Sequence, residues 1–150
     1  MRTAGETATG AGTEIGGAVA VALLRESLVT ARLAARHASA VLAAEGFALD
    51  EWLVLDVLAQ EPGTTMSQLR AATVIDKATL GRRVDRLVTR ALVYREVDGL
   101  DRRVIRVHLS ARGRDVHSGL TARLAQEQQA GAPSGEQHTG QHQPVGLEAR

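Results

Sequence analysis

Apolar residues recur at alternating spacings of three and four between residues 14 and 44, the spacing of one face of an α-helix. The main stripe consists of Val21, Leu24, Leu28, Ala31, Ala35, Ala38 and Leu42. A second set, on a neighbouring face, consists of Val29, Leu33 and Ala40. A helix with so wide an apolar surface either lies within the core of its own chain or packs against a partner chain, and both interpretations stay open.

Turn residues divide the following stretch into shorter segments. The run from Gly46 to Leu49 ends the long helix, and Asp50 is the expected N-cap of a second helix over residues 51–60. The charge of Glu51 favours the first turn of that helix, because the N-terminal end of a helix is partially positive. Pro62-Gly63 then ends it.

Two further helix starts are marked by capping residues. Thr65 and Gln68 form a T-x-x-Q capping box, which predicts a short helix through about Ala72. Asp76 is the predicted N-cap of the next helix, over residues 77–90. Two short helices joined by a tight turn, the second of them rich in arginine, are typical of a helix-turn-helix.

Apolar and polar residues alternate in the strand manner over residues 92–97 and 103–109. The charged segment between them, residues 98–102, begins with Asp-Gly, a strong β-hairpin signal. Ser110 is the predicted N-cap of a final helix over residues 111–128. A charged hairpin that follows a helix-turn-helix is typical of a wing.

These elements predict a mainly α protein with a small β-hairpin wing. A winged helix-turn-helix domain over residues 50–110 is flanked by helices over residues 14–44 and 111–128. Residues 1–13 are small and polar, and residues 129–150 are rich in Gln, Gly, His and Pro. We expect both termini to be disordered, because such segments bury too little apolar surface to fold.

Composition narrows the range of functions. The chain has no cysteine, which excludes disulfides, thiolate catalysis, thiol redox sensing and cysteine-ligated zinc. Its three aromatic residues, Phe47, Trp52 and Tyr94, are too few for the stacking platforms that bind single-stranded nucleic acid. The apolar run at residues 15–24 is shorter than the roughly 20 residues that span a bilayer, and acidic residues precede it, unlike a signal peptide. We therefore expect a cytoplasmic protein with no membrane partner.

Charge is distributed unevenly along the chain. Residues 66–114 contain twelve basic and five acidic side chains, a net charge of +7, whereas the whole chain has a net charge of only +1. The remaining segments are therefore acidic. A basic module between acidic segments indicates a polyanion as the partner of that module.

The predicted helix over residues 77–90 is the candidate DNA-reading element. If Leu80, Val84 and Leu87 dock on the core, the remaining surface carries its polar and basic side chains. The candidates for DNA contact are Lys77, Thr79, Arg82, Arg83 and Arg86. A helix fits the major groove of B-DNA, where arginine bonds bidentately to guanine. Residues early in such a helix meet bases, so we expect Thr79, Arg82 and Arg83 near bases and Arg86 nearer the DNA backbone.

The tip of the predicted hairpin supplies a second set of candidates. Arg102 and Arg103 lie there, and an arginine on a wing is attracted by the negative potential of the narrow minor groove. Asp101 is poorly suited to a phosphate contact because of its charge. We expect it to hold a neighbouring arginine in a fixed rotamer.

The same region resembles a known family. The strings L-V-Y-R at residues 92–95, D-R-R at 101–103 and L-S-A-R-G at 109–113 follow the pattern G-L-V-x-R, D-x-R and L-T-x-x-G of the MarR family of bacterial regulators. The string V-D-R-L at residues 84–87 extends the match into the preceding helix. The wing motif followed by L-S-x-x-G is the specific part of this resemblance.

The resemblance implies a homodimeric repressor that binds a palindromic DNA duplex. Helices 14–44 and 111–128 would dimerise, helix 77–90 would lie in the major groove, and Arg103 would enter the minor groove with Asp101 as its structural aspartate. Many members release DNA when a small phenolic or other aromatic effector binds between the dimerisation and DNA-binding regions. That is the effector class we expect.

Three features depart from the family pattern. Ala91 stands where the family usually has glycine, the residue best suited to a positive φ at the end of a helix. Gly81 replaces a common Thr or Ser in the DNA-reading helix and costs about 1 kcal/mol of helix propensity. Residues 129–150 do not follow the pattern of the further dimerisation helix that the family usually has.

The sequence gives little support for a metal site or for catalysis. His138 and His142 are four residues apart but have no third ligand placed to help, so we expect no metal site and no cofactor. There is no nucleophile elbow and no glycine-rich phosphate loop, so we do not expect an enzyme. The alternative is a winged-helix module for protein–protein contacts without specific DNA binding, which Gly81 and the shortened C-terminus favour.

Overall fold

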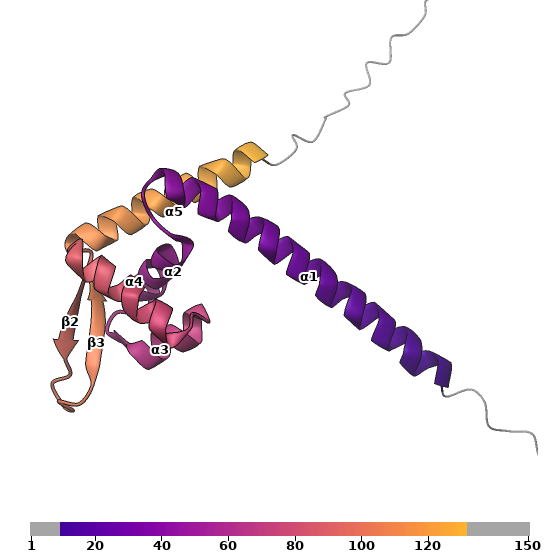
Figure 1. Cartoon of the computed structure of the whole chain (residues 1–150), viewed down its shortest axis with the longest axis horizontal. Helices are drawn as coiled ribbons and strands as arrows, with labels where there is room; N and C mark the ends of the chain where they lie inside the picture. Colours follow the sequence, from indigo (N-terminus) through magenta and orange to yellow (C-terminus); the bar gives the residue numbers. More distant parts are fainter. Residues whose placement is uncertain (1–9, 132–150) are drawn as a thin grey trace, which may run out of the picture.

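The computed structural model describes residues 10–131 and confirms the mainly α fold with a hairpin wing (Figure 1). Its helices and strands follow one another as α1 (Gly10–Ala44), α2 (Leu49–Gln60), β1 (Thr64–Thr65), α3 (Met66–Thr73), α4 (Lys77–Thr89), β2 (Val93–Val97), β3 (Ile105–Leu109) and α5 (Ala111–Gly131). Helix α2 lies at the centre and contacts α1, α3, α4, α5 and β3. No helix within this part of the chain is long and apolar enough to cross a membrane.

The start of α2 differs from the prediction. Ala48 is the N-cap, not Asp50, and the backbone N–H of Ala48 donates to the carboxylate of Glu51 at 2.8 Å. A glutamate at the third helical position supplies this bond from within the helix, so the helix can begin without a polar cap side chain. The side chain of Glu51 is fully buried.

The caps of α3 and α4 confirm the prediction. The N–H of Thr65 donates to Gln68 Oε1 at 2.9 Å, and the N–H of Gln68 donates to Thr65 Oγ1 at 3.3 Å, which completes the capping box. The N–H of Thr79 donates to Asp76 Oδ1 at 2.9 Å. This backbone bond is the main cause that holds the pKa of Asp76 below its usual value.

The wing belongs to a three-stranded antiparallel sheet of order β1-β3-β2. Strands β2 and β3 form the predicted hairpin, with Val93 opposite Leu109 and Val97 opposite Ile105. The third strand, β1, was not predicted, because two residues are too few to show an alternation. It pairs with the middle of β3, with Thr64 opposite Val107 and Thr65 opposite Arg106, and so connects α3 to the wing.

The L-S-x-x-G string joins the wing to α5 through close backbone contacts. Ser110 Oγ donates to the carbonyl of Ala91 at 2.8 Å and accepts from the N–H of Gly113 at 2.9 Å. A Cβ at position 113 would lie 2.0 Å from the carbonyl oxygen of Leu92, so only glycine fits there. Ala91 has a φ of 56°, and the chain therefore makes this turn in the left-handed region without glycine.

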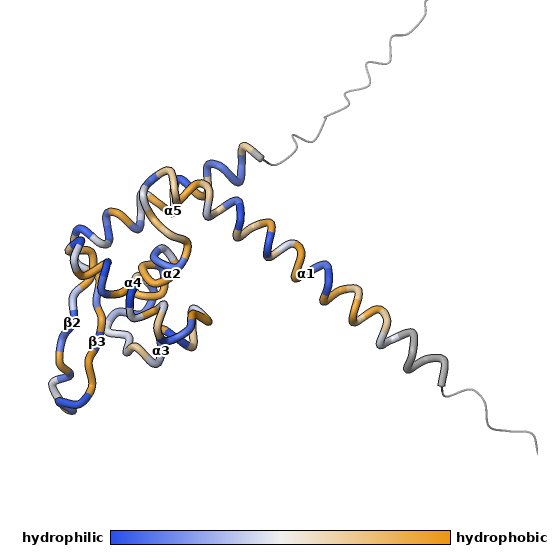
Figure 2. The backbone as a smooth tube through the Cα atoms, in the orientation of Figure 1, coloured by the Kyte–Doolittle hydropathy of each residue, from blue (hydrophilic) through white to orange (hydrophobic). Residues whose placement is uncertain are grey.

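Helix α1 extends far from the rest of the chain (Figures 1 and 2). Near its C-terminal end, Leu42 is fully buried in the core. Further out, Val21 is 67% exposed and Leu28 is 53% exposed, although both belong to the predicted apolar stripe. Most of that stripe therefore meets solvent in the single chain.

Helix α1 begins earlier than predicted, and α5 ends later than predicted. Residues 10–13, predicted to be disordered, form the first turn of α1, and residues 129–131 form the end of α5. Adding a residue to an existing helix is far easier than starting one, so weak helix formers continue it. The predicted disorder of residues 1–9 and 132–150, with His138 and His142, falls outside the described residues.

Candidate nucleic-acid interface

Helix α4 carries Thr79, Arg82 and Arg86 on the face opposite its buried stripe, with Lys77 and Arg83 on the two flanks of that face. Successive residues turn by about 100° around a helix. Leu80, Val84 and Leu87 are buried against the core, so Arg82 points away from it. Lys77 lies on the flank nearest α3 and borders a hollow there. Arg83 lies on the opposite flank, and Thr79 and Arg86 lie beside Arg82.

Arg83 and Arg86 are turned toward acidic residues at the start of α2. The Nε of Arg83 lies 3.6 Å from Asp50 Oδ2, and the Nε of Arg86 lies 3.1 Å from Oε1 of the buried Glu51. The sequence pattern did not indicate these pairs. Their charge is partly neutralised within the domain, which leaves less of it for a DNA phosphate.

The outer part of α4 keeps a smaller polar set. Lys77 and Arg82 are exposed and Thr79 is half-buried. The guanidinium of Arg82 donates to Thr79 Oγ1 at 3.1 Å, one helical turn away. Within the part of the chain that the structure describes, these three members of the predicted set on α4 make no hydrogen bond or ion pair with α2, and we call them the reading face.

A hollow of about 410 Å³ lies beside the reading face, between α3 and α4. Its lining combines basic, hydroxyl and apolar side chains with one glycine: Met66, Ser67, Arg70, Lys77, Leu80 and Gly81. Arg70 was not among the predicted contact residues. Its place in the basic stretch was a signal that could have included it.

The wing tip is held by two aspartates. The carboxylate of Asp98 accepts from the N–H groups of Leu100 and Asp101 and from Nε of Arg106. The bond from the Asp101 N–H, followed by the contact with Arg106, lowers the pKa of Asp98 to about 2. Asp98 therefore anchors the hairpin, a role that we had not predicted.

The second aspartate acts on backbone. Asp101 Oδ1 accepts from the backbone N–H of Arg103 at 3.0 Å. Asp101 therefore fixes the backbone at Arg103, whereas we had expected it to hold an arginine side chain. Arg102 and Arg103 are both exposed at the tip. The wing is also tied to α4, because Arg95 in β2 pairs with Asp85 at 2.6 Å.

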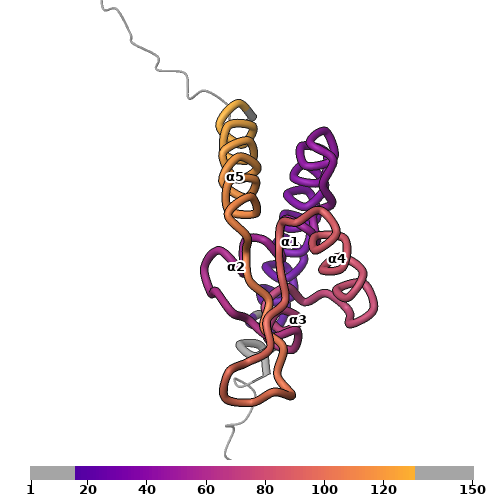
Figure 3. Tube along the Cα trace, turned by 90° about the vertical axis from the view of Figure 1, so that its left-hand side faces the viewer, coloured from indigo at the N-terminus to yellow at the C-terminus, as the bar shows by residue number. Residues whose placement is uncertain are grey.

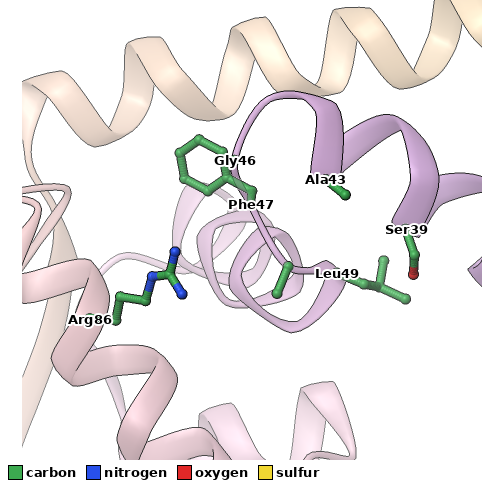
Figure 4. Close-up of a pocket in the computed structure, with 7 residues that line it drawn as sticks. Ser39, Ala43, Gly46, Phe47, Leu49 and Arg86 are labelled. Atoms are coloured by element: carbon green, nitrogen blue, oxygen red, sulfur yellow. The ribbon is translucent and has the colours of Figure 1, made fainter.

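A second hollow, of about 470 Å³, lies where the end of α1 and the turn into α2 face α4. Figure 4 shows Arg86 extending from α4 toward the ring of Phe47. The residues that line this second hollow are Ser39, Ala43, Gly46, Phe47, Ala48, Leu49 and Arg86. This hollow is shallow and open to solvent, and its mostly apolar lining contains one cation, Arg86. Such a lining is suited to a small anion that carries a ring or an alkyl group.

A comparison with known protein families found a match for the domain that carries this site. Residues 45–104, from the turn before α2 to the wing, match the model of the MarR family. This domain belongs to the MarR family. The matched segment contains the helix-turn-helix, the reading face and the wing tip.

Solved structures have the same fold as the MarR-family domain and its flanking helices. The apo form of MarR from E. coli is 22% identical, with 70% of this chain and 78% of that chain covered and a TM-score of 0.67. BpsR of Bordetella bronchiseptica, described as regulated in its DNA binding by 6-hydroxynicotinic acid, is 23% identical over 73% and 88% of the two chains, with a TM-score of 0.60. Reduced AbfR bound to DNA is 21% identical over 76% and 83%, with a TM-score of 0.63. No curated protein gave a significant match.

Proposed function

We propose that this protein is a transcription regulator that binds double-stranded DNA in a sequence-specific way, with α4 in the major groove and the wing in the minor groove. The observation that carries the proposal is the exposed basic reading face on α4, together with the exposed arginines 102 and 103 on the anchored wing tip. The MarR-family fold supports it, and the related AbfR has been solved bound to DNA.

The contacts of α4 divide its polar residues into a group that binds DNA and a group that holds the helix against α2. Lys77, Thr79 and Arg82 meet the DNA, and arginine at the centre of such a helix reads guanine. Arg83 and Arg86 hold α4 against α2 and set the angle at which the reading face is presented. This changes the expectation from the sequence, in which all five residues contacted DNA.

The regulator acts as a homodimer through α1. Seven large apolar side chains of this helix are at least half exposed: Val19, Val21, Leu23, Leu24, Leu28, Val29 and Leu33. Val21, Leu24 and Leu28 share one face, and the other four lie elsewhere around the helix. So much exposed apolar surface on an extended helix is typical of a surface covered by partner helices. A dimer would present two reading faces to the two halves of a palindromic site.

A small aromatic or phenolic anion is the expected effector, and the hollow beside Arg86 is its site. An anion there would compete with Glu51 for the guanidinium of Arg86 and so alter the contact between α2 and α4. Release of DNA on binding would make the protein a ligand-responsive repressor. Isothermal titration with 6-hydroxynicotinate and salicylate as probes tests this site, with Arg86→Ala as the variant that should lose the heat of binding.

The DNA-binding proposal is tested with variants of the wing. Arg103→Ala should weaken binding to a selected duplex. It should also reduce the slope of the log–log salt plot by about 1, since the protein loses one cation that displaces counterions from the DNA. Arg123→Ala in α5, which pairs with Glu45 far from the wing, is the matched control and should bind as the wild type does. Equal affinity of Arg103→Ala and the control would remove the wing from the mechanism. Capture of a defined protein partner without DNA preference would favour the interaction-module alternative.

A further inference from the structure

Gly81 is a glycine that the fold does not require. It lies in the middle of α4, and its φ is not in the left-handed region that favours glycine. A Cβ built at this position has no heavy atom within 4 Å, so alanine would fit here without a clash. Gly113 is the opposite case, since a Cβ there collides with backbone. Glycine inside a helix lowers the stability of the fold relative to alanine. Gly81 has this cost, and no packing contact in the domain compensates for it.

The space that the missing side chain leaves is part of the hollow between α3 and α4 (Figure 3 shows these helices from a second side). Arg70 from α3 and Lys77 from α4 contribute its charge, and both side chains are exposed. Ser67 contributes a hydroxyl group. Leu80 and Met66 form an apolar part of the lining, and Leu80 is almost fully buried.

This lining matches one chemical group in particular. A phosphodiester with its deoxyribose presents anionic oxygens next to an apolar sugar face. Arginine, lysine and serine are side chains that commonly bond phosphate oxygens of DNA. Met66 and Leu80 offer an apolar contact for the sugar. A glycine lets a ligand approach the helix backbone more closely than any other residue does.

We infer that Gly81 is a clearance residue, which admits one sugar–phosphate unit of a DNA strand into the hollow between α3 and α4, where Arg70 and Lys77 bind its phosphate. This inference rests on the proposed DNA-binding function and adds to it a residue that sets how deeply the duplex is seated. Gly81 then acts through shape and contributes no hydrogen bond of its own.

Filling the hollow tests the inference. Gly81→Leu should lower affinity for a selected duplex at least tenfold and reduce the slope of the salt plot, because the strand can no longer reach the two cations. Gly119→Leu is the matched control: it also lies in a helix, α5, and a Cβ there meets nothing within 4 Å. The control should bind DNA as the wild type does. Both variants should melt at or above the wild-type temperature, which excludes unfolding as the cause.

A double-mutant cycle separates clearance from a merely local disturbance. Arg70→Ala should reduce the salt slope by about 1 in the wild type and by almost nothing in Gly81→Leu, since the contact is already absent there. A full effect of Arg70→Ala in the Gly81→Leu background, or wild-type affinity of Gly81→Leu, would overturn the inference. Absence of DNA binding by the wild type would instead contradict the proposed function, so the two failures are distinguishable.

Discussion

Glu51, fully buried near the start of α2, lies 3.1 Å from Nε of Arg86, on the helix that we propose to read DNA. The same carboxylate group accepts a hydrogen bond from the N–H of Ala48, the N-cap of α2. One side chain therefore starts the central helix and holds α4 against it. The neighbouring pair of Asp50 and Arg83, at 3.6 Å, acts along the same contact.

Removal of Arg86 tests this coupling. Arg86→Ala leaves the buried carboxylate without its counter-charge, which costs about 1–3 kcal/mol, toward the lower end because the arginine is itself half exposed. The double variant Glu51→Gln, Arg86→Ala should recover part of that loss, since no unpaired buried charge remains. Chemical denaturation measures both. Equal stability of Arg86→Ala and the wild type would mean that the pair contributes nothing.

Two aspartates at helix starts should differ in their contribution to stability. Asp76→Ala removes the bond to the Thr79 N–H and should cost about 1 kcal/mol of unfolding free energy. Asp50→Ala removes only a partly exposed ion pair and should cost about half of that or less. A larger loss from Asp50→Ala in denaturant melts would argue for a cap at Asp50 and against one at Ala48.

The wing should lose its order in acid. The pKa of Asp98 is about 2 in the folded chain and 3.8 in its ordinary state, so its contribution is complete above about pH 4 and is lost as the pH falls through about 2. The N–H resonances of Leu100 and Asp101 should therefore titrate with a midpoint near 2. In Asp98→Ala the same two amides should exchange rapidly already at neutral pH, with the helices intact. Unchanged protection in that variant would show that the tip is held by other bonds.

Charge on the exposed stripe of α1 should separate the proposed dimer. Leu24→Glu combined with Leu28→Glu places two carboxylates on side chains that are 59% and 53% exposed in the single chain. The monomer should keep its helicity, whereas its mass by sedimentation should fall from that of two chains to that of one. Wild-type protein that sediments as a monomer would remove α1 from the mechanism.

Local signals predicted much of the fold, because each rests on residues a few positions apart. The Thr65–Gln68 box and the Asp76 cap involve bonds over three residues, and the Asp-Gly turn lies within one hairpin. The start of α2 was placed wrongly because a cap residue and a glutamate at the third helical position both supply acceptors, and the pattern favours the more common one.

Contacts between elements could not be predicted in the same way. Spacing along α4 shows that Arg83 and Arg86 lie off the core stripe, but it does not show which flank α2 occupies. The pair of Glu51 and Arg86 joins residues 35 positions apart, so it depends on how two helices are packed. Strand β1 likewise exists because β3 offers it a partner, not because its two residues favour a strand.

Sequence-specific DNA binding is tested by a titration of the wild-type protein against a duplex selected from a random library. Fluorescence anisotropy monitors the titration at several salt concentrations with competitor DNA present. We predict saturable binding that survives the competitor and falls linearly on a log–log salt plot, which gives the number of phosphate contacts. Equal affinity for the selected duplex and a scrambled one at every salt concentration would contradict a sequence-specific regulator.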